Sequence, residues 1–240
     1  MDQTPQSLPF LKQVQKTNQY SYLNRMQETT SKERILKKIR KALIHKTSAR
    51  FPSIDWDKNI YVKTEDSLEE QFAHSFTKVG GQFVFCENEI EFLENIITLA
   101  QENKWKQFYC CEKKITDLLN QVEFPFTQED KSYPEGMVAI TSCEALVARL
   151  GSVMISSKLG SGRKLFVVPT IHIIMAYTSQ LVPELKDALV KIKGKYNDQL
   201  PSMVAALTGP SRTADIEKTL VTPAHGPRDI IVFLIDDSNQ

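Results

Sequence analysis

From residue 60 to residue 238, short apolar runs alternate with stretches of helical periodicity, and this alternation constrains the fold more than any other feature of the sequence. Several runs are apolar on successive residues, as strands covered on both faces are. We therefore predict an α/β fold with a largely parallel sheet and ligand sites at strand ends. The expected strands are NIYVKT, GGQFVFCE, KQFYCC, GMVAIT, GSVMISS, KLFVVP, IHIIMAY, SMVAALTG and RDIIVFLID.

Helical periodicity fills many of the gaps between these runs. Pro183 suits the first turn of a helix, and Leu185, Ala188, Leu189 and Ile192 share one face of the segment that it opens. Only a short polar break separates GSVMISS from KLFVVP, which predicts an antiparallel hairpin within the parallel order. The expected helices cover residues 66–79, 88–103, 112–120, 142–150, 183–193 and 212–221.

The chain divides, in our interpretation, into an N-terminal helical extension, residues 1–55, and an α/β domain, residues 56–240. Thr30 and Glu33 have capping-box spacing, and Ile35, Ile39 and Leu43 fall on one face, so we predict an amphipathic helix over about residues 31–46. Residues 32–50 contain eight Lys or Arg and one Glu, a net charge of +7. This segment is either a docking arm for an acidic partner or a solvated helix face.

Composition excludes several classes of function. The whole chain has a net charge of only +1, which gives no indication of a nucleic-acid partner. Its cysteines, Cys86, Cys110, Cys111 and Cys143, have neither a disulfide framework nor C-x-x-C spacing. We find no signal peptide and no apolar run of roughly 20 residues. We therefore expect a reduced, cytoplasmic protein with no metal site and no membrane span, and the sequence identifies no cofactor.

Residues 206–227, ALTGPSRTADIEKTLVTPAHGP, hold the densest group of polar and turn-forming residues. A strand ending in Gly209 and a helix beginning near Thr213 would leave free backbone N–H groups and a positive dipole end, which favour an anion. The alternative is that Ser211 or Thr213 merely caps the helix while Asp215 and Glu217 complement its dipole. The predicted ligand-binding residues of this turn are Thr208, Gly209, Ser211, Arg212, Thr213 and Asp215.

His225 is the candidate catalytic residue. It precedes Gly226-Pro227 and the last apolar run, which places it at a loop rim beside the expected anion site. The competing interpretation is a structural or exposed histidine, which is the commoner case. His172 alternates with isoleucines in IHIIMAY and is expected in the core.

A second candidate group lies in ITSCEALVARLGSVMIS. There we expect a strand to end at Thr141, Ser142 to cap a helix, and the next strand to start after a turn. Arg149 faces either a ligand crevice or solvent. The predicted ligand-binding residues of this group are Thr141, Arg149, Gly151 and Ser152.

TGPSRTADIEKTLV followed by HGPRDIIVFLID resembles the C-terminal signature of the LUD-domain family. SKERILKKIRKAL resembles the family's N-terminal helix, and GMVAITSCEALVARLGSVMIS with VVPTIHII resembles its central region, so the resemblance covers most of residues 31–238. It implies a three-layer α/β fold similar to the sugar-phosphate isomerase and CoA-transferase group. Ligands then bind at the C-terminal ends of strands.

The resemblance also implies a function. Lactate-utilization members of the family look like components of a three-part cytoplasmic system that oxidises L-lactate to pyruvate, in which the other two components carry the iron–sulfur motifs. The resemblance thus implies iron–sulfur proteins as partners, and we expect the chain to bind an anionic small molecule through the turn at residues 208–213. One departure concerns Arg149, which stands where the family commonly has a glutamate, and a second concerns Pro223, where a glycine is common.

Two further functions stay open at the level of sequence. The chain is alternatively a stand-alone enzyme acting on a phosphorylated or CoA-linked metabolite, with His225 as acid or base and Arg212 holding the anion. It is alternatively a non-catalytic structural or regulatory subunit, whose basic helix docks on the iron–sulfur components.

Overall fold

The computed structural model describes residues 30–44, 55, 65–128, 134, 136–197, 199–214, 220–221 and 226–238. They belong to two compact units, residues 1–63 and residues 64–240. The described part of the first unit is essentially one helix, α2 (Ser31–Ile44), which begins at the predicted capping box. Thr30 N–H donates to Glu33 Oε2 at 2.9 Å, and Glu33 N–H donates to Thr30 Oγ1 at 3.3 Å.

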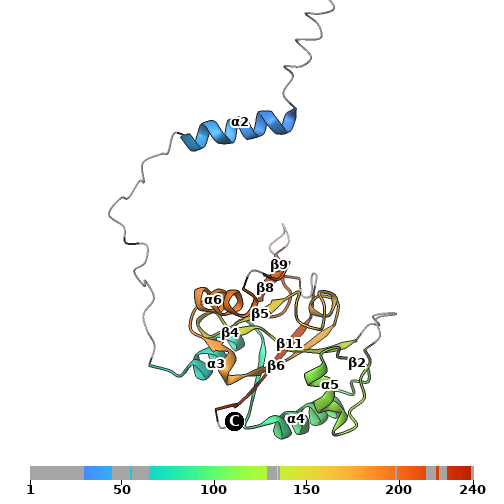
Figure 1. The fold of residues 1–240 in the computed structure, drawn as a ribbon. Coiled ribbons are helices and arrows are strands. Elements are labelled where there is room, and N and C mark those ends of the chain that lie inside the picture. Colours follow the sequence, from blue (N-terminus) through green and yellow to red (C-terminus); the bar gives the residue numbers. More distant parts are fainter. Residues whose placement is uncertain are drawn as a thin grey trace, which may run out of the picture. The chain divides into compact units, whose positions relative to one another are not determined.

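The second unit contains a five-stranded, wholly parallel sheet with the strand order β1-β11-β6-β3-β2 (Figure 1). The central strands are buried on nearly every residue, as the unbroken apolar runs predicted. The prediction of an α/β fold with a parallel sheet is therefore confirmed. The strands are β1 (Gln82–Cys86), β2 (Phe108–Tyr109), β3 (Val138–Thr141), β6 (Ile171–Tyr177) and β11 (Asp229–Ile235).

Helices lie where their periodicity and capping residues predict. Ser67 and Glu70 form a capping box at the start of α3, and Asn88 Oδ1 accepts from two N–H groups at the start of α4. Among the helices that the structure describes, none is long and apolar enough to cross a bilayer. The helices of the second unit are α3 (Leu68–Lys78), α4 (Glu89–Glu102), α5 (Lys113–Asn120) and α6 (Leu185–Tyr196).

A second sheet, with the order β7-β4-β5-β8, mixes parallel and antiparallel pairs. Together with α3 it packs on one face of the parallel sheet, where Phe72, Leu146 and Val232 share a single apolar cluster. The opposite face of the parallel sheet is covered by α4 and α5, and α6 covers the outer face of the second sheet (Figure 1). The strands of the second sheet are β4 (Ala145–Val147), β5 (Ser152–Ser156), β7 (Leu181–Val182) and β8 (Val204–Leu207).

The helix predicted over residues 142–150 is wrong. Residues 145–147 form β4 and residues 148–150 a short 3₁₀ helix. The physical reason is burial on two sides: Leu146 joins the cluster between the sheets, whereas Ala145 and Val147 join the cluster under α6. Such alternation suits a strand, because a helix of this length would bury one side.

The hairpin predicted from GSVMISS and KLFVVP is also wrong. Residues 164–166 form a 3₁₀ turn, in which Val167 N–H donates to Lys164 O at 3.0 Å, and Pro169 follows without an N–H to donate to a sheet. β5 instead pairs antiparallel with β4 and β8. The strand expected at residues 59–64 lies outside the described residues.

Candidate functional site

The predicted residues at the end of β8 lie around the C-terminal turn of α3. The hydroxyl oxygens of Ser152 and Thr208 are 2.8 Å apart, which joins the start of β5 to the end of β8. Arg212 donates a hydrogen bond from Nη2 to the carbonyl oxygen of Val79, the residue that ends α3. The structure therefore brings Ser152, Thr208 and Arg212 into one region, although they come from two of the predicted groups.

Two glycines of these groups let α3 approach. Gly151 has a φ of +57°, and a β-carbon there would lie 2.4 Å from the backbone nitrogen of Phe76. Gly209 has a φ of +80°, and a β-carbon there would lie 2.5 Å from the carbonyl oxygen of Val79. Neither position accepts a side chain unless the backbone of α3 moves. Their observed role is close packing, and their role in ligand binding stays a prediction.

The helix predicted over residues 212–221 is wrong where the structure describes it. Thr213–Ala214 forms strand β9, which pairs antiparallel with β10 (Leu220–Val221). β-branched Thr213 and Val221 favour the extended backbone. No helix begins at Thr213, so the helix dipole cannot attract an anion there, and the N–H of Ser211 already donates to Pro227 O at 3.0 Å. Two predicted site residues, Asp215 and His225, lie outside the described residues.

Arg149 faces an acidic partner. Its Nε lies 2.7 Å and 2.8 Å from the two carboxylate oxygens of Glu184, the residue before α6, and both side chains are about three-quarters buried. The carbonyl of Arg149 also accepts from Ser75 Oγ at 3.3 Å. Arg149 thus ties the second sheet to α6 and α3.

Thr141 lies apart from the turn at β8, on the parallel sheet beside His172. Thr141 Oγ1 is 2.8 Å from His172 Nε2 and donates its proton to Ser142 O at 3.2 Å, so the imidazole must donate through Nε2. Nδ1 is left without a hydrogen-bond partner. Burial lowers the pKa of His172 to about 3, so the ring is neutral at physiological pH. The predicted core position of His172 is confirmed.

The sequence interpretation missed a cluster at the carboxyl end of β3. Glu112 accepts hydrogen bonds from the backbone N–H of Ser142 at 2.9 Å and from the hydroxyls of Ser142 and Ser161. Ser142 therefore binds a carboxylate and does not cap a helix. A signal was available, because Glu112 and Ser142 each follow an apolar run, and carboxyl ends of neighbouring parallel strands share one edge of a sheet.

Glu144, two residues further along, is buried and accepts three hydrogen bonds. Its donors are Ser156 Oγ at 2.5 Å, Tyr196 OH at 2.7 Å and Lys195 Nζ at 2.7 Å. Burial raises the pKa of this carboxyl, but the bonds from Lys195, Ser156 and Tyr196 outweigh burial and hold it below its ordinary value. The end of β3 and the connection to β4, residues 141–144, thus carry three carboxylate or hydroxyl groups with fixed partners.

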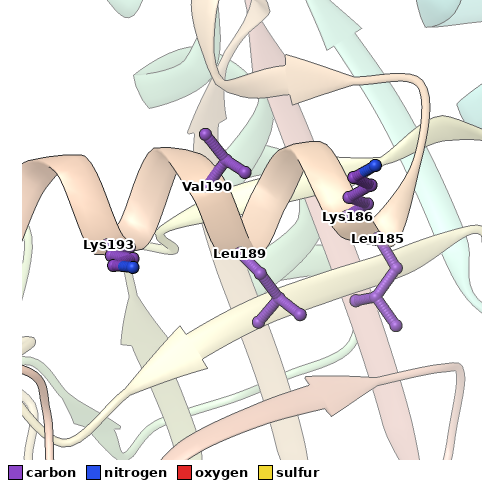
Figure 2. A pocket seen from close by; sticks show the side chains of 5 residues that line it. All are labelled: Leu185, Lys186, Leu189, Val190 and Lys193. Atoms are coloured by element: carbon purple, nitrogen blue, oxygen red, sulfur yellow. The ribbon is translucent and has the colours of Figure 1, made fainter.

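Two shallow pockets lie away from these groups. One, of about 420 Å³, is lined entirely by α6, and Figure 2 shows Leu185 and Leu189 projecting to the same side of that helix. The other, of about 500 Å³, lies at the end of α4 and includes Trp105, Phe108 and Phe124. Neither pocket contains a predicted site residue.

The cysteines of the chain are free thiols, and three of the four are buried. Burial raises the pKa of Cys110 to about 12 and raises that of Cys143 further, which disfavours the thiolate that a metal requires. Across the described segments, no group of three or more His, Cys, Asp or Glu side chains could hold a metal ion.

Comparison with known sequences relates the chain to one family. The model of the LUD domain matches residues 135–235. A lactate utilization protein C from Macrococcus caseolyticus is 27% identical over 176 residues, which cover 72% of this chain and 70% of that protein. The lactate utilization protein C of Bacillus licheniformis is 34% identical over 102 residues, and the match spans 42% of its length.

Comparison with solved structures agrees on the fold. The crystal structure of a DUF162 family protein from Deinococcus radiodurans matches with a TM-score of 0.50 at 15% identity, covering 70% of this chain and 96% of that one. At this identity the likeness concerns the fold alone. A closer likeness to the sugar-phosphate isomerase and CoA-transferase group stays a prediction.

Proposed function

Since this chain carries a LUD domain at residues 135–235, we propose that it is a component of a lactate utilization system. The observation that carries the proposal is the family match together with several relatives named lactate utilization protein C. These names support a role in lactate utilization. The proposed reaction is the oxidation of L-lactate to pyruvate in the cytoplasm, which removes two electrons and two protons from the substrate.

In this proposal the electrons pass to iron–sulfur partner proteins, and this chain has no cluster of its own. Two observations support that division. The cysteines lack cluster spacing, and burial keeps the thiols of Cys110 and Cys143 protonated.

Arg212 is the proposed binding group for the anionic ligand. Lactate and pyruvate are both carboxylates, which arginine recognises through paired N–H donors. One donor of Arg212 is used by Val79, which anchors the exposed guanidinium at the C-terminal end of α3. His225 is proposed as the acid–base residue, because Gly226, its neighbour in the chain, lies against Ser211: a β-carbon at 226 would be 3.3 Å from Ser211 Cβ.

The role is tested by deleting the gene in its host and growing the strain on L-lactate as the carbon source. We expect growth on L-lactate to fail, growth on pyruvate to continue, and the wild-type gene to restore the first. In a host without another lactate oxidation route, normal growth of the deletion strain on L-lactate contradicts the proposal.

Ligand binding is tested separately by calorimetry with L-lactate, pyruvate and inorganic phosphate. Arg212→Lys keeps the charge but loses the paired donors, so we expect carboxylate affinity to fall by about tenfold or more. Arg163→Lys, which changes another exposed arginine, is the matched control. Equal affinities in wild type and Arg212→Lys would remove Arg212 from the site while leaving the role in lactate utilization untouched.

Glu112 favours one alternative, a stand-alone enzyme acting on a phosphorylated or CoA-linked metabolite. A carboxylate at a strand end, held by two hydroxyls and an N–H, has the chemistry of a general acid or base. This alternative predicts turnover by the purified chain without partners, and its loss in Glu112→Gln. A purified chain that turns over none of these substrates excludes it.

A further inference from the structure

Helix α2 has two faces of opposite character. At 3.6 residues per turn all of its apolar side chains except Ile44 fall within an arc of roughly 120°, wide enough for a continuous apolar face. Apart from Lys32 in the first turn, the basic side chains occupy the rest of the circumference. The apolar residues of this face are Ile35, Leu36, Ile39, Ala42 and Leu43, and the basic residues opposite are Arg34, Lys37, Lys38, Arg40 and Lys41.

Within the described residues of the first unit, nothing covers this apolar face. No residue of α2 is buried, and its leucines and isoleucines are between 40% and 76% exposed. An isolated helix of 14 residues gains little stability from its own hydrogen bonds, so a partner that buries this face would stabilise it. The helix contains six Lys or Arg and one Glu, a net charge of +5 in a chain whose total is +1. The partner must therefore combine an apolar interior with negative charge.

We propose that α2 binds parallel to the surface of an anionic lipid bilayer. Lys38 and Arg40 flank the apolar face, so their stems can follow Ile39 into the acyl boundary while their charges reach the headgroups. Lys37 and Lys41 lie farther from the acyl chains and add long-range attraction to anionic headgroups. At about 21 Å the helix is too short to span the hydrocarbon core, and interfacial binding is the remaining membrane geometry.

A bilayer surface fits these observations better than an acidic protein groove. A groove would have to offer a narrow apolar floor for Ile35 and Leu43 and acids on both flanks, in register with one helix. A membrane plane supplies negative charge on both flanks and apolar depth along the full length, without a specific register.

The test is co-sedimentation of the full chain with two kinds of vesicle, phosphatidylcholine alone and phosphatidylcholine with about one-third phosphatidylglycerol. We expect binding to the anionic vesicles only, weakened by added salt. The double variant Lys37→Glu/Lys41→Glu should lower partition by at least about tenfold, since each basic residue contributes measurably near an anionic surface. Ile39→Ser/Leu43→Ser should lower it comparably without changing charge.

The matched control is Lys186→Glu/Lys193→Glu, which reverses two exposed charges on α6 (Figure 2). It should leave vesicle binding unchanged, and equal loss in this control would show a nonspecific charge effect and overturn the proposal. Failure of the wild-type chain to bind anionic vesicles also overturns it. If the wild-type chain does not bind vesicles but captures an acidic protein, and the same α2 variants abolish that capture, α2 is a protein-docking surface and the bilayer proposal is wrong.

Discussion

Lys195 donates a 2.7 Å hydrogen bond to Glu144, a carboxylate whose side chain is completely buried although that of Lys195 is about half exposed. The pair connects the last turn of α6 to the segment between β3 and β4. Because the carboxylate cannot reach water, its charge depends on three protein donors, of which Lys195 is the only cation.

Lys195→Met should therefore destabilise the fold, because it leaves a buried carboxylate without its cation. Breaking such a pair typically costs about 3–5 kcal/mol, and the exposure of Lys195 places the expected loss at the lower end, about 3 kcal/mol. Urea unfolding measures it. Lys193→Met, on the exposed side of the same helix, is the control and should change the free energy of unfolding by less than about 0.5 kcal/mol. Equal effects of both substitutions would contradict the assigned role of Glu144.

His172 should make the fold less stable as pH falls below neutrality. Its folded pKa of about 3 lies below the ordinary value of 6.5, so between these values the unfolded chain binds a proton that the folded chain does not. The free energy of unfolding should drop by about 2 kcal/mol between about pH 7.5 and about pH 5 from this group alone. Glu144, whose folded pKa is also lowered, adds to the loss at lower pH.

The measurement is urea unfolding of wild type and His172→Gln across that pH range. The glutamine variant has no titrating ring, so its slope with pH should be shallower by about one proton, whatever its absolute stability. Parallel slopes would show that His172 is protonated in the folded state or that its ring reaches solvent.

Gly151→Ala should destabilise the fold more than Gly162→Ala. Both glycines have positive φ, +57° and +68°, so both substitutions carry a conformational cost of roughly 1–2 kcal/mol. A methyl group at 162 meets nothing within 4 Å, whereas at 151 it overlaps the backbone at Ser75 and Phe76. We expect about 1–3 kcal/mol of additional loss at 151. Thermal unfolding checks this difference, and equal losses would mean that α3 shifts freely.

Arg149→Ala should cost about 1.5–3 kcal/mol, because it removes a charge-assisted bond and leaves Glu184 without its cation in a largely buried site. Arg149→Glu places two carboxylates together and should cost more. Exchanging the pair, Arg149→Glu with Glu184→Arg, should recover part of the loss. Additive effects in this double-mutant cycle would show that the two side chains do not interact.

Much of the parallel sheet and its helices follows from local patterns. IHIIMAY and DIIVFLI are apolar on consecutive residues, and both lie in the centre of the sheet. The side chains of Ser67 and Asn88 cap α3 and α4 through bonds to residues within the same four-residue segment. The local sequence therefore contains the information that predicts these helix starts.

The second sheet and the site depend on contacts that the local pattern does not contain. The local pattern predicts a helix over residues 145–147. They form a strand because α6 and the parallel sheet, which are distant in the chain, bury them on two sides. Glu112 lies 30 positions from Ser142 and 49 positions from Ser161 in the sequence, and no spacing rule links these residues. The close approach of α3 to Gly151 and Gly209 is likewise a contact between distant segments, and the binding of a ligand by these two glycines stays a prediction.

Among the strands that the structure describes, β1 pairs with β11 alone, and Gln82 pairs with Ile231, which is 149 positions later in the chain. During synthesis, β1 and α4 leave the ribosome long before β11 exists. The edge of β6 that pairs with β11 also stays unpaired until then. Closure of such distant pairs is slow, so the nascent chain carries an exposed apolar edge until β11 is translated. A stop codon before residue 229 would remove the strand that separates β1 from β6, and a chain with most of its length intact would then be a substrate for chaperones and proteases.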